Sequence, residues 1–123
     1  MWLADSSAES AQPCIVHTST ASAAEAERIA ASLVEERLAA CCTMIPGIQS
    51  LYRWKGALQR ETEYMLLIKS DLRLFPALEK RIRELHSYDV PEILAVRVAA
   101  ASEDTLAWMR ESLRESGPRD NPT

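Results

Sequence analysis

Residues 41–70 read CCTMIPGIQSLYRWKGALQRETEYMLLIKS, and much of this segment follows a period of two. The side chains of residues 51–54 alternate between two faces, as they do along a β-strand. Gly56 permits a tight turn, because glycine adopts the positive φ angles that such turns need. An apolar run at 64–68 then suits a strand that is buried on both faces. The segment therefore predicts two long strands joined by a tight turn.

The two predicted strands, at 41–54 and 58–69, are long for a small domain. Such strands extend roughly 45 Å, whereas the radius of gyration of a domain of this size is about 13 Å. The projecting part of the hairpin carries four apolar side chains: Leu51, Tyr52, Trp54 and Leu58. We expect sister chains to cover this apolar ribbon in an obligate homo-oligomer. Pro46-Gly47 is predicted to bend or bulge the first strand, because proline cannot donate to the ladder. The alternative to an oligomer is a hairpin that bends at Pro46-Gly47 and folds back on its own sheet.

The residues before the hairpin predict a strand at 14–18 and then a helix. Ser22 and Glu25 match a capping box, in which a hydroxyl and a carboxylate accept hydrogen bonds from free N–H groups. One apolar helix face follows at steps of three and four residues: Ala26, Ile29, Ala30, Leu33, Val34 and Leu38. A strand and an amphipathic helix therefore precede the hairpin.

After the hairpin, Asp71 is predicted to cap a second helix that extends to Leu85, although Pro76 disturbs its first turn. Residues 93–98 predict a strand, and Ser102 is predicted to cap a last helix. The order β-α-β-β-α-β plus a C-terminal helix predicts an α+β protein with the ferredoxin-like fold. This fold has an antiparallel sheet with helices on one face.

Length and composition favour a single domain. The chain has 123 residues, and we expect flexible tails at 1–12 and 114–123 around a domain at 13–113. A net charge of −4 argues against nucleic acid as a partner. The first residues lack a basic segment, and no apolar run is long enough to cross a membrane. Three cysteines, two of them adjacent, fit a reducing compartment, so we expect a cytoplasmic protein.

The sequence holds no catalytic motif that we recognise, and its few glycines leave no phosphate-binding loop. Soft or borderline metal ligands are present as Cys14, His17, Cys41, Cys42 and His86. Adjacent strand residues point to opposite faces, so Cys41 and Cys42 are poorly placed to share one ion. One alternative is a nucleophilic cysteine activated by His86, and another is a set of buried, inert thiols.

A further polar set is suited to line a cleft between subunits. It consists of Trp54, Glu61, Lys69, His86, Tyr88 and Glu92. Such a cleft would bind an anionic or zwitterionic ligand. The alternative is that these side chains form ion pairs and hydrogen bonds that hold subunits together.

Five segments of the chain together resemble the CutA family, the divalent-cation tolerance proteins. They are LVEERLAAC at 33–41, IPG at 45–47, YRWKG at 52–56, EYMLLIK at 63–69 and HSYDVPEI at 86–93. The resemblance covers residues 14–113 in the family's order and spacing. It implies a ferredoxin-like subunit in a tight homotrimer whose extended hairpins pack between neighbours. The resemblance also implies a role in tolerance of copper and other divalent cations, without enzymatic activity.

The metal ligands that the resemblance implies are present only in part. Family members credited with copper binding have a cysteine at the end of the first strand and a histidine pair before a Pro-Tyr segment. Here those positions hold Thr18, Leu85 and His86, and Ser87 replaces the proline. Cys41 matches another family cysteine. His86 and Cys41 are therefore the candidate ligands for copper or another divalent cation, with partners from another chain and weak binding.

We therefore expect a non-enzymatic homotrimer that responds to divalent metal ions. The CutA architecture is similar to that of the PII signalling proteins, which bind small effectors in clefts between subunits. This similarity supplies an alternative: a signalling trimer that binds a small anionic metabolite or a partner protein in such clefts. Trp54, Lys69, Tyr88 and Glu92 match family positions, and Glu61 completes the expected cleft set.

Overall fold

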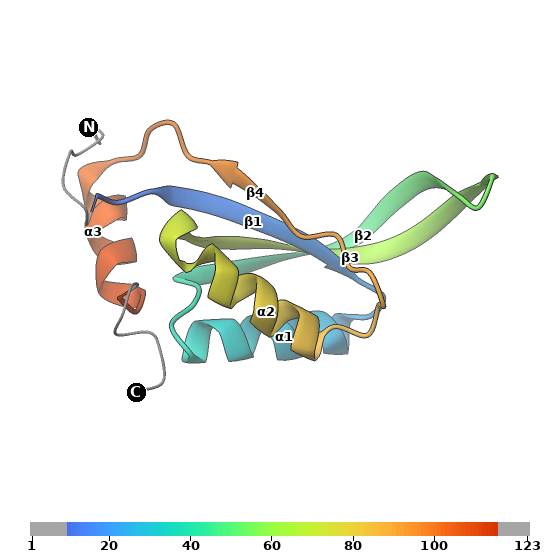
Figure 1. Ribbon diagram of the computed structural model, residues 1–123, viewed down its shortest axis with the longest axis horizontal. Helices are drawn as coiled ribbons and strands as arrows, with labels where there is room; N and C mark the ends of the chain where they lie inside the picture. Colours follow the sequence, from blue (N-terminus) through green and yellow to red (C-terminus); the bar gives the residue numbers. More distant parts are fainter. Residues whose placement is uncertain (1–9, 116–123) are drawn as a thin grey trace.

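The computed structural model describes residues 10–115, which fold into an α+β domain (Figure 1). Its elements are β1 (Pro13–Thr20), α1 (Ala23–Glu35), β2 (Cys41–Trp54), β3 (Ala57–Asp71), the 3₁₀-helix η1 (Leu72–Leu74), α2 (Phe75–Leu85), β4 (Leu94–Arg97) and α3 (Glu103–Ser112). The four strands form one antiparallel sheet in the order β2-β3-β1-β4. The predicted ferredoxin-like order is therefore confirmed.

The tails predicted at 1–12 and 114–123 lie largely outside the described residues. At their inner borders, the Gln12 N–H donates to Asp71 Oδ2 at 2.8 Å, and the Arg114 N–H donates to the Arg37 carbonyl at 2.9 Å. The division into tails and domain stays a prediction.

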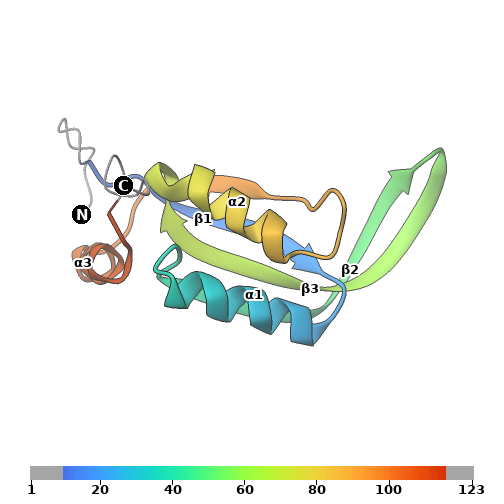
Figure 2. The ribbon, with the colours of Figure 1, turned by 60° about the horizontal axis from the view of Figure 1, so that its bottom comes forward.

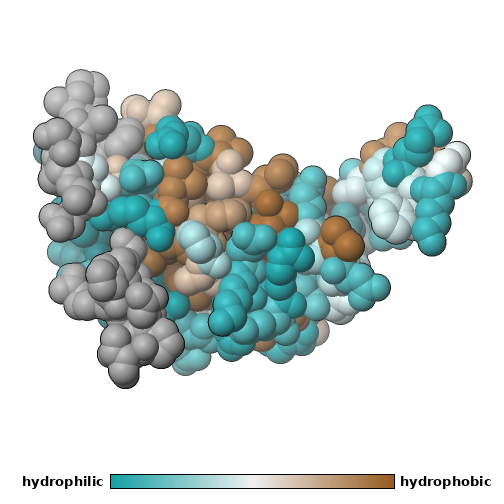
Figure 3. Space-filling view, viewed as in Figure 1, coloured by the Kyte–Doolittle hydropathy of each residue, from teal (hydrophilic) through white to brown (hydrophobic). Residues whose placement is uncertain are grey.

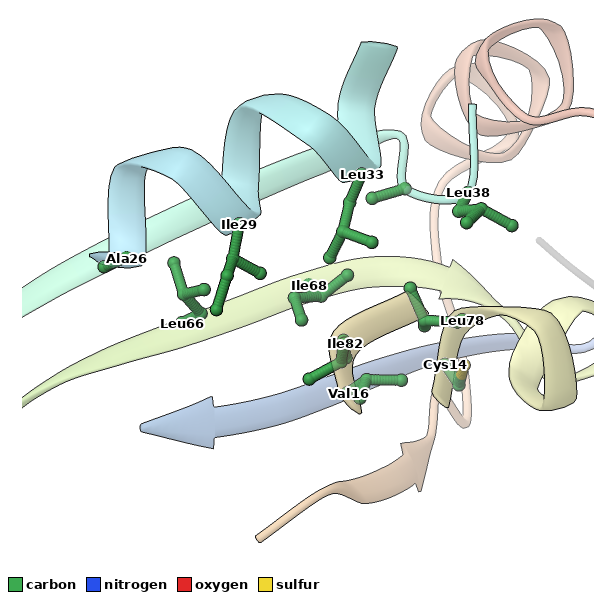
Figure 4. Close-up of a cluster of buried hydrophobic side chains, with 11 residues drawn as sticks. Cys14, Val16, Ala26, Ile29, Leu33, Leu38, Leu66, Ile68, Leu78 and Ile82 are labelled. Atoms are coloured by element: carbon green, nitrogen blue, oxygen red, sulfur yellow. The ribbon is translucent and has the colours of Figure 1, made fainter. Parts of the chain in front are cut away.

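The helices α1 and α2 lie side by side on one face of the sheet (Figure 2). Their apolar faces meet the sheet in a core of buried side chains (Figure 4). The core residues are Cys14, Val16, Ala26, Ile29, Leu33, Leu38, Ala39, Leu66, Ile68, Leu78 and Ile82. No described helix covers the opposite sheet face, which we call the open face (Figure 2).

The start of α1 confirms half of the predicted capping box. Ser22 Oγ accepts a hydrogen bond from the Glu25 N–H at 3.2 Å, as expected. The Glu25 carboxylate was expected to bind the helix start as well, and this expectation is wrong. It accepts hydrogen bonds from the Ser87 N–H at 2.7 Å and from Ser87 Oγ at 3.0 Å. A buried carboxylate needs strong donors, and the loop after α2 supplies two of them.

The second helix begins later than the sequence predicts. Asp71 does cap a turn, because its side chain accepts from the Arg73 N–H at 2.9 Å, but the turn is η1 and not α2. The α-helix starts at Phe75, with Pro76 in its first turn. Proline lacks an N–H and is tolerated only where the helix leaves that group unpaired, so Pro76 fixes the start of α2.

The hairpin of β2 and β3 has the predicted irregularity. The strand register shifts between Ile45 and Ile48, as expected for a bulge at Pro46-Gly47, where Gly47 has a φ of 69°. At the tip, Gly56 has a φ of 81°, which confirms the predicted turn. The hairpin bends away from the helices and projects past them (Figures 1 and 2). Its apolar side chains are exposed: 57% for Leu51 and 67% for Leu58.

Candidate functional site

The adjacent cysteines of β2 lie on opposite faces of the sheet, as predicted. Cys42 packs against the core, whereas Cys41 lies on the open face. Lys69 is the cross-strand partner of Cys41, and its Nζ lies 3.8 Å from Cys41 Sγ. The same ammonium group donates to Thr43 Oγ1 at 3.5 Å. Cys41 thus belongs to a small polar group, with a cation and a hydroxyl beside it.

The other two thiols are shielded from reaction. Burial, strengthened by the charge of Asp71, raises the pKa of Cys14 to about 11. Burial, together with the charge of the neighbouring Cys41, raises the pKa of Cys42 to about 12. Because the thiolate is the nucleophile, both thiols are almost entirely protonated at neutral pH.

We expect brief alkylation with iodoacetamide at neutral pH to modify Cys41 first. Cys14 and Cys42 should react at least about 100-fold more slowly, because so little of either is thiolate. Peptide mass spectrometry measures each rate, and Cys41→Ser should remove the first phase of modification. We expect Cys41 to react no faster than a small model thiol. A faster reaction would favour the nucleophilic-cysteine alternative, and equal rates for Cys41 and Cys42 would contradict the burial argument.

His86 is buried, and both of its ring nitrogens have hydrogen-bond partners. Nε2 donates to the Ser19 carbonyl at 2.8 Å, while Nδ1 accepts from the Tyr88 N–H at 3.1 Å. This assignment follows because a carbonyl only accepts and an amide N–H only donates. Glu25 Oε2 lies 3.5 Å from Nδ1. The imidazole therefore holds the loop after α2 against the end of β1 and has no free lone pair for a metal.

The two predicted metal ligands, His86 and Cys41, lie far apart in the folded chain. His86 contacts Ser19, which pairs with Met65 of β3, whereas Cys41 pairs with Lys69 four residues further along β3. Four strand residues correspond to about 13 Å. Among residues 10–115, no group of three or more His, Cys, Asp or Glu side chains is placed to hold a metal. Copper binding by His86 and Cys41 of one chain does not fit this arrangement.

A hydrogen-bonded group forms at the base of the hairpin around Glu63. Tyr88 Oη donates to Glu63 Oε2 at 2.8 Å, and Ser50 Oγ donates to Oε1 at 2.7 Å. Burial raises the pKa of Tyr88 above its usual range, and the hydrogen bond to Glu63 and the charge of Glu61 add to this effect. The group links the loop after α2 to both strands of the hairpin, so it fixes the direction in which the hairpin leaves the sheet.

The structure brings together only part of the predicted cleft set. Tyr88 and Glu61 lie at the hairpin base, close enough to interact electrostatically. Trp54 pairs with Ala57 at the hairpin tip, twelve residues along β3 from Lys69, which corresponds to about 40 Å. Glu92 is exposed in the segment before β4. Within one chain these side chains cannot line a single cleft, so a shared cleft requires more than one chain.

Sequence reasoning missed the buried carboxylates of Glu25 and Glu63, which are 6% and 8% exposed. For Glu63, one signal was present in the sequence. It directly precedes the apolar run at 64–68, where a charge must find partners because burial of an unpaired carboxylate is costly. The identity of those partners was not visible, since Ser50 and Tyr88 are distant in sequence.

Comparison with known proteins identifies the family. The family model described as CutA1 divalent ion tolerance protein matches residues 14–112. The chain belongs to the CutA1 family. A curated CutA1-family relative, the divalent-cation tolerance protein CutA of Thermus thermophilus, is 46% identical over 87 residues. This alignment covers 71% of the present chain and 84% of the relative.

Solved structures of CutA1 proteins share the fold. The Thermus thermophilus protein has a TM-score of 0.81 at 41% identity, and the alignment covers 83% of this chain and 99% of that one. CutA1 from Oryza sativa has a TM-score of 0.84 at 35% identity, with coverages of 86% and 97%. A rice relative, 36% identical over 83% of this chain and 58% of its own length, is named as chloroplastic. None of the described helices has the length and apolarity to span a membrane.

Proposed function

We propose that this CutA1-family chain forms a non-enzymatic homotrimer in the cytoplasm and acts in tolerance of divalent metal ions by binding at clefts between subunits. The observation that carries the proposal is the apolar surface that a single chain leaves uncovered on the projecting hairpin and on the open sheet face. The names of the relatives describe tolerance of divalent cations. Three free thiols suit a reducing compartment.

The uncovered apolar surface is extensive. On the hairpin, Trp54 is 56% exposed and Leu58 is 67% exposed. On β4, Leu94 and Val96 are 47% and 59% exposed, and they belong to the open sheet face. Figure 3 shows hydrophobic surface gathered over the strands, next to hydrophilic surface over the helices. Contiguous apolar surface of this kind marks an interaction site, and identical chains are the partner that is always present.

The donor set argues for weak metal binding that involves more than one chain. His86 has no free nitrogen, and the ammonium group of Lys69 beside Cys41 repels a cation. Thr18, at the position of the family's first-strand cysteine, is fully buried on the helix side of the sheet. Copper or another divalent cation would therefore need ligands contributed by neighbouring chains.

Lys69 supports the second candidate function, a PII-like signalling trimer. Its ammonium group and the Thr43 hydroxyl lie 3.5 Å apart on the sheet face without a helix. A cation with a hydrogen-bond donor beside it suits an anionic metabolite in a cleft between subunits.

Light scattering and calorimetry test the proposal. We expect the mass of three chains at low micromolar concentration. Titration of the reduced trimer with Cu(I) and Cu(II) should give binding that is weakened in Cys41→Ser. In Lys69→Met, any stabilisation by small anions should be lost while the trimer mass is kept. The mass of a single chain would refute the homotrimer. An intact trimer that binds no metal in the micromolar range would refute the metal-binding role.

A further inference from the structure

The helix α3 is separate from the core of the domain. Figures 1 and 2 show it at one end of the sheet, apart from the layer that α1 and α2 form. Its two buried side chains, Leu106 and Met109, do not belong to the core cluster, whose residues come from α1, α2, the loop after α1 and the strands β1 and β3. The packing of the core therefore does not include α3.

A residue of the loop after α1 binds the C-terminal end of α3. Arg37 Nη2 donates a hydrogen bond to the Glu111 carbonyl. The Arg37 carbonyl accepts a hydrogen bond from the Arg114 N–H at 2.9 Å. A cationic side chain at this end of a helix also interacts favourably with the helix dipole. Arg37 therefore holds α3 through both its side chain and its backbone.

Arg37 occupies a backbone position that favours glycine. Its φ is 62°, in the left-handed region. The Arg37 N–H donates to the Val34 carbonyl at 3.1 Å. The Leu38 N–H donates to the Leu33 carbonyl at 2.9 Å, which completes a Schellman motif at the end of α1. Glycine is the usual residue there because it has no Cβ to strain the turn. The end of α1 does not need an arginine, whereas the end of α3 uses its guanidinium group.

A short connection joins the other end of α3 to β4. The Val98 N–H donates to the Pro13 carbonyl at 3.0 Å and so continues the contact between β4 and β1. Residues 99–101 are alanines outside any helix or strand, and Ser102 caps α3. Rotation within these alanines lets α3 move while β4 keeps its place. Once released, the ten residues of α3 lose their helix, because isolated helices shorter than about 12–15 residues are marginal in water.

We infer that α3 is a releasable strap: it detaches and unfolds as a unit while α1, α2 and the sheet stay folded, and Arg37 sets how often this happens. This inference concerns the single chain and does not depend on the proposed homotrimer. The strap is fastened at Arg37, in the loop that leads into Cys41 at the start of β2. Its release therefore loosens the chain next to the polar group of Cys41, Lys69 and Thr43.

Hydrogen exchange measured by mass spectrometry on the complete chain tests the inference. In the wild type, we expect the amides of α3 to exchange faster than those of β1 and β3. Their exchange should also depend less on urea, because a local opening exposes less surface than global unfolding does. Exchange in α3 that matches β1 and β3 at every urea concentration would show that α3 unfolds only with the core, and would overturn the inference.

Arg37→Gly separates the role of the guanidinium group from that of the backbone. Glycine suits the positive φ, so α1 should stay as well protected as in the wild type. Exchange in α3 should rise by at least about tenfold, because a hydrogen bond from a charged group is lost. Arg37→Asn is the second variant, since asparagine also adopts positive φ and lacks the guanidinium group, and it should behave in the same way.

Arg83→Gln is the matched control. The Arg83 guanidinium group binds Glu79 within α2 at 3.3 Å, so its loss should leave exchange in α3 unchanged. An unchanged α3 in both Arg37 variants would overturn the role of Arg37. Equal acceleration of α1 and α3 in both variants would assign Arg37 to the stability of the whole domain, and it would also overturn the inference.

Discussion

Ile29→Ala is expected to lower the free energy of unfolding by about 2–5 kcal/mol. Ile29 is completely buried and points from α1 toward β3, where Leu66 and Ile68 are also completely buried (Figure 4). The substitution removes apolar contacts with the sheet and leaves a cavity, because the rigid layers around it relax only in part. Both terms destabilise the native state.

Urea denaturation at one fixed protein concentration measures this loss, since association adds a concentration-dependent contribution to stability. Val34→Ala is the matched control on the same helix. Val34 is 42% exposed, so its truncation should cost less than about 1 kcal/mol. Equal losses in the two variants would contradict the packing of α1 on the sheet.

Asp71→Asn is expected to lower the free energy of unfolding by about 1.5–3 kcal/mol at neutral pH, the usual value of a hydrogen bond to a charged group. Asp71 Oδ1 accepts from the Arg73 N–H and from Arg73 Nε, each at 2.9 Å. Oδ2 accepts from the Gln12 N–H at 2.8 Å and from Arg73 Nη2 at 3.2 Å. An amide nitrogen in place of one oxygen would set a donor against these donors.

The same carboxylate produces a pH dependence of defined sign. Burial alone raises the pKa of Asp71, but the hydrogen bonds from Arg73 and Gln12 outweigh it and hold the pKa below its usual value. The stabilisation is therefore complete above about pH 4 and is lost as the pH falls through the lowered pKa of the folded state. Unfolding curves of wild type and Asp71→Asn should converge in acid. Asp89 is exposed, so Asp89→Asn serves as the control. Its free energy of unfolding should equal that of the wild type at every pH.

Local patterns in the sequence predicted the fold well. The limits of β2, the cap at Ser22, the bulge at Pro46-Gly47 and the turn at Gly56 are all confirmed. Each of these features depends on one residue and its near neighbours. The start of α2 was harder to predict from the sequence. Asp71 and Pro76 each mark a helical start, and the chain uses Asp71 for η1 and Pro76 for α2.

The candidate site was harder to predict because its contacts are distant in sequence. Glu25 has the right spacing for a capping box, yet its carboxylate binds Ser87, 62 residues away. His86 has the residue type of a metal ligand, yet both nitrogens are engaged with backbone groups. Residue type sets which contacts are possible, and only the packing of the loop against β1 and α1 decides which of them form.

The position of β2 at the edge of the sheet bears on whether strands of other chains can pair with it. It is an outer strand of the sheet over its whole length, Cys41–Trp54, and such a free edge is a template for endless fibre growth. Pro46 lacks an N–H, and the bulge beside it breaks the straight row of backbone groups that an added strand would need. This edge therefore disfavours the growth of an open filament by strand addition.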